Sequence, residues 1–263
     1  MKTKVILTGM AFAMLFFACK NKPEEQEKTK EELTLSKKTF ASLPPPPSGR
    51  TWRLVESDEF NSSLNLNIWG HGGTPWGTES HDGACNLNTA SNSFTRDGSL
   101  IVRARKGPFT GPSGKSYPYS TDYVWTKNRR TYGYLEIRAK YPDVRGNWAA
   151  FWMLGDGWPP EIDIAEFRGR PKNYMTHAFY DGAWWGGPNS TGNFTGWHTY
   201  GLLWEKGSLK FYVDDVLKST VTRTSVPAVP MYVILSNGVE CNDTDGTGFP
   251  NEYVVDYFRW YQN

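Results

Sequence analysis

Three carboxylates occur within six residues of the chain, in the segment Glu161-Ile162-Asp163-Ile164-Ala165-Glu166. The other three residues of the segment are apolar. Burying charged side chains among them costs free energy, so their presence suggests a function. If the segment is a strand, alternation places Glu161 and Asp163 on one face and Glu166 on the other. A β-bulge at Ile164-Ala165 would return Glu166 to the face of the other two acids.

The spacing of these acids fits one kind of chemistry. With the bulge, the carboxyl groups of Glu161 and Glu166 would lie about 5–5.5 Å apart, the separation that hydrolysis of a glycosidic bond with retained configuration requires. The plainer alternative is a solvated edge strand whose acids face water. The pattern alone favours neither interpretation.

Short alternating or β-branched runs recur along the chain between turn signals, and such runs predict strands. The clearest are residues 100–104, 134–139, 209–213, 231–235 and 253–261. Glycine and proline clusters separate them, and no stretch from residue 52 to 263 keeps a helical period for long. Many short strands without helices predict an all-β sandwich of two packed antiparallel sheets.

The N-terminal residues predict export. Lys2 and Lys4 precede an apolar run over residues 5–18, which is too short to span a bilayer and is typical of a signal peptide. The segment Leu-Phe-Phe-Ala-Cys at 15–19 resembles a bacterial lipobox, in which Cys19 becomes the lipidated first residue. We therefore expect membrane attachment through a lipid on Cys19, and a plain signal peptide with a chance cysteine is the alternative.

A charged segment follows the cysteine. Residues 20–38 are rich in Lys and Glu with hardly any apolar residue, so they cannot bury enough surface to fold. Four prolines at 44–47 add a stiff spacer. We divide the chain into a lipoprotein signal peptide at 1–18, a charged and proline-rich linker at 19–50, and one folded domain at 51–263. The expected location is the bacterial outer membrane or cell surface, with secretion as the alternative.

Charge and cysteine content limit the partners. The formal net charge of +2 over 263 residues gives no electrostatic footprint for nucleic acid, so we expect no nucleic-acid partner, and we expect a monomer. Cys85 and Cys241 are the only cysteines of the folded part. In an oxidising compartment they could form one bridge, and two free buried thiols are the alternative.

Several motifs, taken in order, resemble those of glycoside hydrolase family 16. The three acids match the bulged signature E-x-D-x-x-E. The other matches are Ser57-Asp58-Glu59-Phe60 with Ile68-Trp69, Asp97-Gly98-Ser99-Leu100, and the segments 132–140, 146–154 and 255–261. Together they cover residues 52–262. The resemblance implies a jelly-roll β-sandwich of two curved antiparallel sheets, with a polysaccharide lying across the concave face.

The resemblance also implies roles for the three acids. Glu161 would be the nucleophile, Glu166 the general acid and then base, and Asp163 the residue that assists between them. The chemistry would require no cofactor. Electrostatics agrees with these roles, since a nearby carboxylate raises the pKa of Glu166, and Asp163 can hydrogen-bond Glu161.

Sugars stack their C–H faces on aromatic rings, so tryptophans are expected to line the cleft. The candidates are Trp148, Trp152, Trp158, Trp184 and Trp185, together with His177, which falls where many family members carry a histidine near the reacting bond. Each has a plainer alternative: Trp152 could belong to the core, Trp184 and Trp185 could only fold their loop, and His177 could be structural.

A calcium ion often lies on the convex face in this family. The resemblance would place it at the carboxylate of Asp256, with backbone oxygens near Glu59 and Gly98. These are oxygen ligands of the kind that calcium takes. Asp256 could equally be a surface acid.

The signature does not choose the polysaccharide. Trp158-Pro159-Pro160-Glu161 and the segment 148–152 are closer to the branch that cleaves internal bonds of β-1,3- or β-1,3-1,4-glucans. A red-algal galactan such as agar, porphyran or carrageenan is the second candidate, since Arg168 could bind sulfate; Arg168 could also be a solvated loop charge. A surface lipoprotein that binds glycans without cleaving them is the third, and the three intact acids argue against it.

Overall fold

The structure is a computed structural model that describes residues 43–46, 49–75, 77–79, 84–170, 172 and 174–263. The predicted signal peptide, Cys19 and the linker up to residue 42 lie outside these residues, so their assignment stays a prediction. The chain divides into the units Met1–Lys38 and Thr39–Asn263, and every described residue belongs to the second. Nothing helical in the described residues has the length and apolar character needed to cross a membrane.

The described residues form many strands and one 3-10 turn, η2 (Ala90–Asn92). The strands are β1 (Arg53–Asp58), β2 (Trp69–Gly70), β3 (Asn86–Asn88), β4 (Ser93–Arg96), β5 (Ser99–Thr110), β6 (Ser116–Thr121), β7 (Tyr123–Thr126), β8 (Gly133–Lys140), β9 (Asn147–Gly155), β10 (Gly157–Arg168), β11 (Tyr174–Tyr180), β12 (Trp184–Thr191), β13 (His198–Glu205), β14 (Ser208–Val213), β15 (Val216–Thr222), β16 (Tyr232–Val239) and β17 (Asn251–Gln262). Four of the five runs predicted from the sequence lie within β5, β8, β14 and β17, and the run 231–235 begins one residue before β16.

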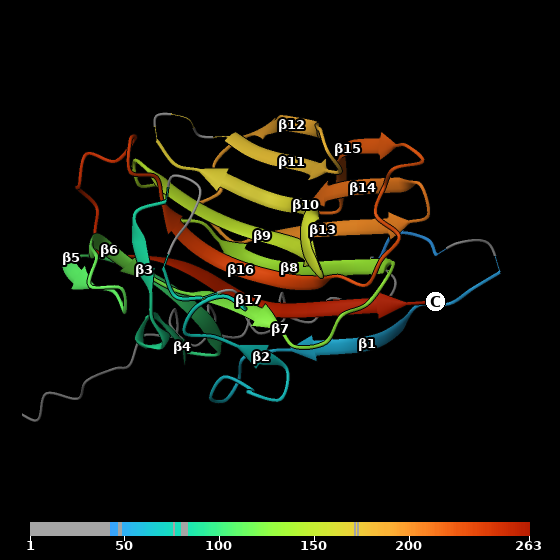
Figure 1. Cartoon of the computed structure of the whole chain (residues 1–263). Coiled ribbons are helices and arrows are strands. Elements are labelled where there is room, and N and C mark those ends of the chain that lie inside the picture. Colours follow the sequence, from blue (N-terminus) through green and yellow to red (C-terminus); the bar gives the residue numbers. More distant parts are fainter. Residues whose placement is uncertain (1–42, 47–48, 76, 80–83, 171, 173) are drawn as a thin grey trace, which may run out of the picture. The chain divides into compact units, whose positions relative to one another are not determined.

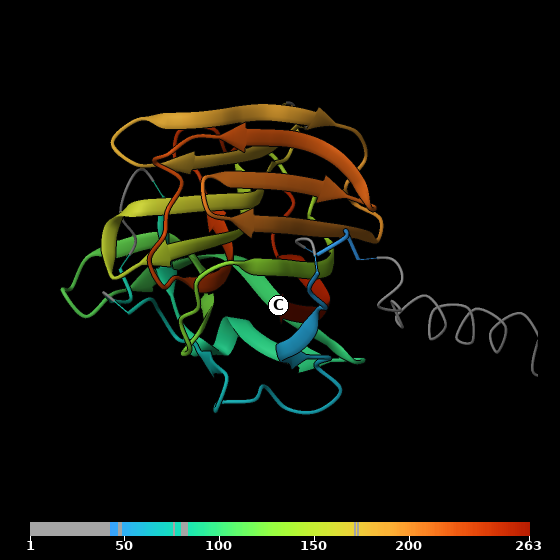
Figure 2. The same cartoon turned by 90° about the vertical axis from the view of Figure 1, so that its right-hand side faces the viewer.

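These strands form two sheets that pack face to face (Figures 1 and 2). The ten-stranded sheet has the order β15-β14-β13-β8-β17-β5-β6-β3, with β1 beside β17 and β4 beside β5. The seven-stranded sheet has the order β12-β11-β10-β9-β16-β7-β2. The pairs of named strands are antiparallel except that β3 runs parallel to β6. The predicted all-β sandwich of two antiparallel sheets is confirmed.

The core lies between the sheets because side chains alternate along each strand. In β9, Phe151 and Met153 are fully buried, whereas Trp148 and Trp152 lie on the other face and are partly exposed. Leu135, on β8 of the opposite sheet, belongs to the same apolar cluster as Phe151. The seven-stranded sheet therefore has one face in the core and one face available for a site.

The folded unit includes residues that precede the predicted domain start at residue 51. Leu43 packs in an apolar cluster with Tyr134, Leu203 and Tyr261. The indole of Trp52 donates a hydrogen bond of 2.7 Å to the carbonyl oxygen of Pro44. The proline-rich segment is thus part of the folded surface where it is described.

Candidate active site

The predicted bulge is present in β10. Toward β11, the register shifts between Asp163 and Glu166, so that Ile164 and Ala165 together oppose a single residue. Toward β9, the register shifts between Asp163 and Ala165. Ile164 and Ala165 are themselves buried in the core. The extra residue leaves Glu166 on the same face as the other two acids.

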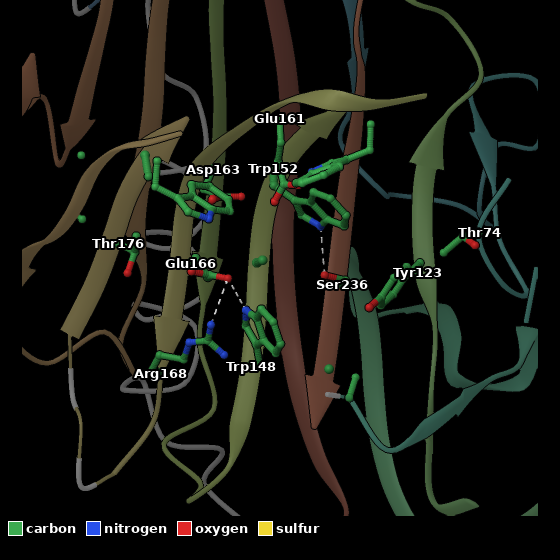
Figure 3. A pocket seen from close by; sticks show the side chains of 18 of the residues that line it. Thr74, Tyr123, Trp148, Trp152, Glu161, Asp163, Glu166, Arg168, Thr176 and Ser236 are labelled. Atoms are coloured by element: carbon green, nitrogen blue, oxygen red, sulfur yellow. Dashed lines mark hydrogen bonds and ion pairs between the residues drawn. The ribbon is translucent and has the colours of Figure 1, made fainter. Parts of the chain in front are cut away.

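Glu161, Asp163 and Glu166 line one cleft on the outer face of the seven-stranded sheet (Figure 3). Two of the residues that pair with them on the neighbouring strands are alanines. Ala150 pairs with Glu166 from β9, and Ala178 pairs with Asp163 from β11; both also line the cleft. Small side chains next to the carboxyl groups leave room for a sugar ring.

Asp163 is the most enclosed of the three acids. It is 4% exposed and its carboxyl group shares a hydrogen bond with Glu161. Burial, followed by the negative charges of Glu161 and Glu166, raises the pKa of Asp163 well above its usual range. This shift favours the protonated form of Asp163, which can donate in the hydrogen bond that it shares with Glu161.

Glu166 lies in a different environment. Burial raises the pKa of Glu166, and this exceeds the lowering by the charge of Arg168 and by a hydrogen bond from Trp148. The indole Nε1 of Trp148 donates to Oε1 of Glu166, and Nη2 of Arg168 lies 3.4 Å from the same oxygen (Figure 3). The cleft thus holds two glutamates in different surroundings. Glu161 shares a hydrogen bond with Asp163, whereas the pKa of Glu166 is raised, which favours its protonated form.

Arg168 lines the cleft as predicted, and its charge is compensated there. Its guanidinium group lies 3.7 Å from the centre of the Trp148 ring. Its Nη1 lies 2.8 Å from Oε1 of Glu240, and Nζ of Lys172 lies 3.0 Å from the other oxygen of that carboxylate. Arg168 is therefore neither a solvated loop charge nor an uncompensated cation.

Aromatic rings extend the cleft beyond Glu161. Nε1 of Trp158 donates a hydrogen bond of 2.8 Å to Oε2 of Glu161. The Trp158 ring stacks on Tyr180 with centroids 4.5 Å apart, and Tyr180 contacts Trp184 with centroids 5.1 Å apart. Trp158 and Trp184 are 57% and 54% exposed. These three rings offer an apolar surface to the C–H faces of sugars, as predicted for the two tryptophans.

The opposite wall is built on Trp152. Its Nε1 donates a hydrogen bond of 3.1 Å to Oγ of Ser236, and Tyr123 packs edge-on against it with centroids 6.3 Å apart (Figure 3). All three side chains line the cleft. The core alternative for Trp152 is therefore wrong.

His177, expected near the reacting bond, faces the core instead. It is 0% exposed, with Nδ1 2.6 Å from the carbonyl oxygen of Ile164 and Nε2 3.0 Å from Oγ of Ser190. Thr176 pairs with Glu166 and lines the cleft, so the next residue of β11 must point to the other face. The cleft prediction for His177 is wrong, and its structural alternative is correct.

Trp185 also lies away from the cleft, whereas its neighbour Trp184 lines it. Nε1 of Trp185 donates a hydrogen bond of 2.9 Å to Asp181, and the guanidinium of Arg223 lies 3.3 Å from the ring centre. The ring packs against the core. Consecutive residues of β12 point to opposite faces, so only one tryptophan of the pair reaches the cleft.

The two acids at the predicted calcium site have side chains that are paired with arginines. Asp256 accepts a hydrogen bond of 2.8 Å from Arg138, and Glu59 binds Nε of Arg259 at 2.8 Å. Among the described residues, no three His, Cys, Asp or Glu side chains form a group that could hold a metal ion. Gly98 lies in the turn before β5 with a φ of +70°. The one carboxylate of the predicted site, that of Asp256, is already paired with a guanidinium group, so the structure gives no support to this site.

The two cysteines of the folded part are free thiols. Cys85 is buried and Cys241 is exposed. Burial, and then a hydrogen bond with Cys241, raises the pKa of Cys85. The thiols are unbridged, as in the alternative, but only Cys85 is buried as that alternative expected.

Some cleft residues carry no motif and were not predicted. They are Tyr123, Thr176 and Ser236, with Tyr180 stacked on Trp158 and Glu240 behind Arg168. They lie on β7, β11 and β16 or directly after β16, and reach the acids only through strand pairing. Alternation along β11 was the one local signal that could have identified Thr176.

The family model described as Glycosyl hydrolases family 16 matches residues 81–259 of the chain. This chain belongs to glycoside hydrolase family 16. The matched span contains all three acids of the cleft and the strands that pair with β10. The resemblance inferred from the motifs is confirmed.

Relatives within the family differ in the polymers for which they are named. ExsH, an endo-1,3-1,4-beta-glycanase of Rhizobium meliloti, is 34% identical over 157 residues, covering 55% of this chain and 34% of that protein. The keratan-sulfate endo-1,4-beta-galactosidase of Sphingobacterium multivorum is 28% identical over 299 residues, covering 99% of this chain and 68% of that protein. The chain spans only 34% and 40% of the lengths of ExsH and EglC, both from Rhizobium meliloti.

Solved structures of the family share the fold. The catalytic domain of an endo-1,3-beta-glucanase (laminarinase) from Thermotoga petrophila superposes with a TM-score of 0.70 at 29% identity, covering 81% of this chain and 98% of that domain. The endo-beta-1,3-glucanase of Pyrococcus furiosus gives a TM-score of 0.69 at 30% identity, covering 84% of this chain and 98% of that enzyme. The family 16 chain is therefore a jelly-roll β-sandwich, as predicted.

Proposed function

We propose that this protein is a retaining endo-hydrolase that cleaves internal β-glycosidic bonds of a β-1,3-glucan or a mixed-linkage β-1,3-1,4-glucan. One observation carries the proposal: three acids lie on the same face of one cleft, in surroundings that affect their pKa values differently. The raised pKa of Asp163 favours its protonated form, which can donate to Glu161, and burial raises the pKa of Glu166. A retaining glycosidase requires one anionic and one protonated carboxyl group in a single cleft.

In the first step, a carboxylate oxygen of Glu161 attacks the anomeric carbon of the sugar. The new bond forms as the bond from that carbon to the leaving oxygen breaks. Glu166 transfers its proton to this oxygen, so the leaving sugar departs as a neutral alcohol. The products of the step are a glycosyl ester on Glu161 and the carboxylate of Glu166.

In the second step, a water molecule replaces the departed sugar. The carboxylate of Glu166 takes a proton from the water, whose oxygen attacks the anomeric carbon while the ester bond to Glu161 breaks. Glu166 regains its proton, and two displacements together retain the configuration. The hydrogen bond from Asp163 stabilises the charge that returns to Glu161.

The choice of a glucan rests on the relatives. ExsH is named for 1,3-1,4-beta-glycan cleavage, and the Niallia circulans protein that aligns over 94% of this chain is named glucan endo-1,3-beta-glucosidase A1. The polymer would lie across rings on both walls of the cleft, Trp158 on one side and Trp152 on the other. A cleft lined in this way suits a chain of sugars rather than a single one.

A galactan is the second candidate. The relative that covers nearly the whole chain is named for keratan sulfate, and Arg168 lies in the cleft beside Glu166. However, Glu240 compensates the charge of Arg168 at 2.8 Å, which weakens attraction to a sulfate group. This contact is a second reason, beside the names of the relatives, to place the glucan first.

Release of reducing ends from laminarin, lichenan, agarose, porphyran, carrageenan and keratan sulfate tests the proposal. We expect cleavage of laminarin or lichenan into a ladder of oligosaccharides whose newly formed ends appear first as the β-anomer by NMR. The matched variant Glu161→Gln should bind these polymers without cleaving them. Cleavage of galactans alone would contradict the glucan proposal, and binding without cleavage by the wild type would identify a glycan-binding protein.

We also propose that the protein is a monomeric lipoprotein of the outer membrane or cell surface, anchored through Cys19. The lipobox-like residues 15–19 and the charged run at 20–38 support this location. Labelling with a radioactive fatty acid in a Gram-negative host checks the anchor. Incorporation into the wild type and its loss in Cys19→Ala are expected, whereas equal labelling of both would contradict it.

A further inference from the structure

The bulge creates two backbone carbonyl groups that need partners. A bulge disrupts the strand pairing locally, and buried carbonyl oxygens without a hydrogen bond are costly. In β10 each of the two bulged residues accepts from a buried side chain. Nδ1 of His177 lies 2.6 Å from the oxygen of Ile164, and the Tyr141 hydroxyl donates to the oxygen of Ala165 at 3.1 Å.

His177 is the residue of β11 that the two bulged residues jointly oppose. A carbonyl oxygen can only accept, so Nδ1 carries the hydrogen, and Nε2 accepts from the hydroxyl of Ser190 at 3.0 Å. The ring stacks on Phe211 of the ten-stranded sheet with centroids 5.5 Å apart. His177 is thus a neutral, fully enclosed donor aimed at one atom of the bulge.

Tyr141 reaches the bulge from the other sheet. It directly follows β8, is 1% exposed, and its hydroxyl also accepts a hydrogen bond of 3.3 Å from Tyr253. Its ring stacks on that of Tyr253 with centroids 4.7 Å apart. Burial raises the pKa of Tyr141, so its hydroxyl remains a donor over the working range of an enzyme.

We propose that His177 and Tyr141 are positioning residues that hold the bulge of β10 and thereby direct Glu166 into the cleft. Both reach the bulge from the core, on the face opposite to Glu166. Without the bulge, alternation would turn that carboxyl group toward the core. The proposal rests on the proposed function only in giving Glu166 the role of acid and base.

Two amide variants of His177 separate the hydrogen bond from the rest of the side chain. The amide group of asparagine lies where Nδ1 lies, so His177→Asn can still donate to Ile164. The longer glutamine places its amide near the position of Nε2. His177→Gln can therefore keep the hydrogen bond with Ser190, but it loses the hydrogen bond to the carbonyl oxygen of Ile164. Since a displacement of 1 Å can cost about 100-fold in rate, we expect kcat to fall about 10- to 100-fold in His177→Gln with little change in KM.

Three further variants complete the test on the full chain. His177→Asn should recover most of the lost kcat. Tyr141→Phe, which removes the donor to Ala165 and leaves the ring, should lower kcat about 3- to 10-fold, as expected for one lost hydrogen bond. Ser190→Ala removes the other hydrogen bond of His177 without reaching the bulge, and should retain kcat within about twofold of the wild type. Thermal unfolding identifies the folded variants, and Tyr141→Phe carries the test should His177→Gln fail to fold.

The outcomes distinguish this proposal from the proposed function. Unchanged kcat in folded His177→Gln and Tyr141→Phe would overturn it, as would an equal loss of kcat in Ser190→Ala. If the wild type cleaves none of the polymers, the proposed function fails, and crystal structures of the two variants decide instead. Glu166 still pointing into the cleft of both would then overturn the positioning role.

Discussion

Nε1 of Trp158 donates a hydrogen bond of 2.8 Å to Oε2 of Glu161, three residues further along β10. A ring that forms the wall of the cleft is therefore also bonded to the carboxylate that we assign as nucleophile. In Trp158→Phe the apolar surface remains and the donor is lost, so we expect kcat to fall about 10-fold, as for one charge-assisted hydrogen bond, with KM nearly unchanged. In Trp158→Ala, KM should rise as well. Steady-state kinetics on the cleaved polymer checks both, with Trp185→Phe, on the other face of its strand, as the control.

The roles of the two glutamates predict opposite products in the presence of azide. In Glu161→Ala, azide can occupy the space of the lost carboxylate and attack from that face, giving an α-glycosyl azide from an activated β-glycoside. In Glu166→Ala the glycosyl ester still forms, and azide attacks from the opposite face to give the β-azide. NMR of the products distinguishes them. The same anomer from both variants would contradict the assignment.

The surroundings of Glu166 predict the alkaline limit of activity. The acid must be protonated, so kcat/KM falls as the pH rises through its pKa. The charge of Arg168 lowers this pKa and that of Glu240 raises it. Arg168→Gln should therefore move the alkaline limb to higher pH, and Glu240→Gln should move it to lower pH. If the alkaline limb moved in the same direction in both variants, the substitutions would be acting on the structure rather than on the charge.

His177 predicts a loss of stability in acid. Burial lowers its pKa from 6.5 to about 4, and the charge of Lys218 acts in the same direction. The groups that contact the ring, Ile164, Ser190 and Phe211, are neutral. Above pH 6.5 the imidazole is neutral in both states, so its stabilisation is complete. As the pH falls toward 4, His177 binds a proton in the unfolded chain but remains neutral in the folded chain. The free energy of unfolding therefore decreases by about 3 kcal/mol.

Urea unfolding at pH 7 and pH 4.5 measures this loss. The matched variant His177→Asn has no group that titrates in the interval, so its stability should fall less between the two pH values. An equal decrease in both proteins would assign the acid sensitivity to carboxylates elsewhere in the fold.

The sequence was sufficient to predict features that depend on local order. The three acids, the bulge at Ile164 and Ala165, and five of the strands follow from alternation and spacing within single segments. Trp158 and Trp152 were also identified as cleft residues, since both lie within a few positions of the acids. These features needed no knowledge of which strands pair.

Features that depend on pairing between distant strands could not be predicted. Whether Thr176 or His177 faces the cleft is decided by the register of β11 against a bulged neighbour, and local sequence leaves that register open. In the same way, the sequence does not show that Arg138 lies beside the carboxylate of Asp256, the side chain predicted to bind calcium. Glu240 reaches Arg168 across 72 positions of the chain, and no motif records that contact.

The alternation of β9 separates two kinds of mutational freedom. Phe151 and Met153 belong to the core, whereas Trp148, Ala150 and Trp152 belong to the cleft. Random substitution along the whole strand would give variants that fail to fold as well as variants with changed specificity. A library restricted to the cleft-facing positions would instead sample new polymer preferences while the packing between the sheets stays as it is.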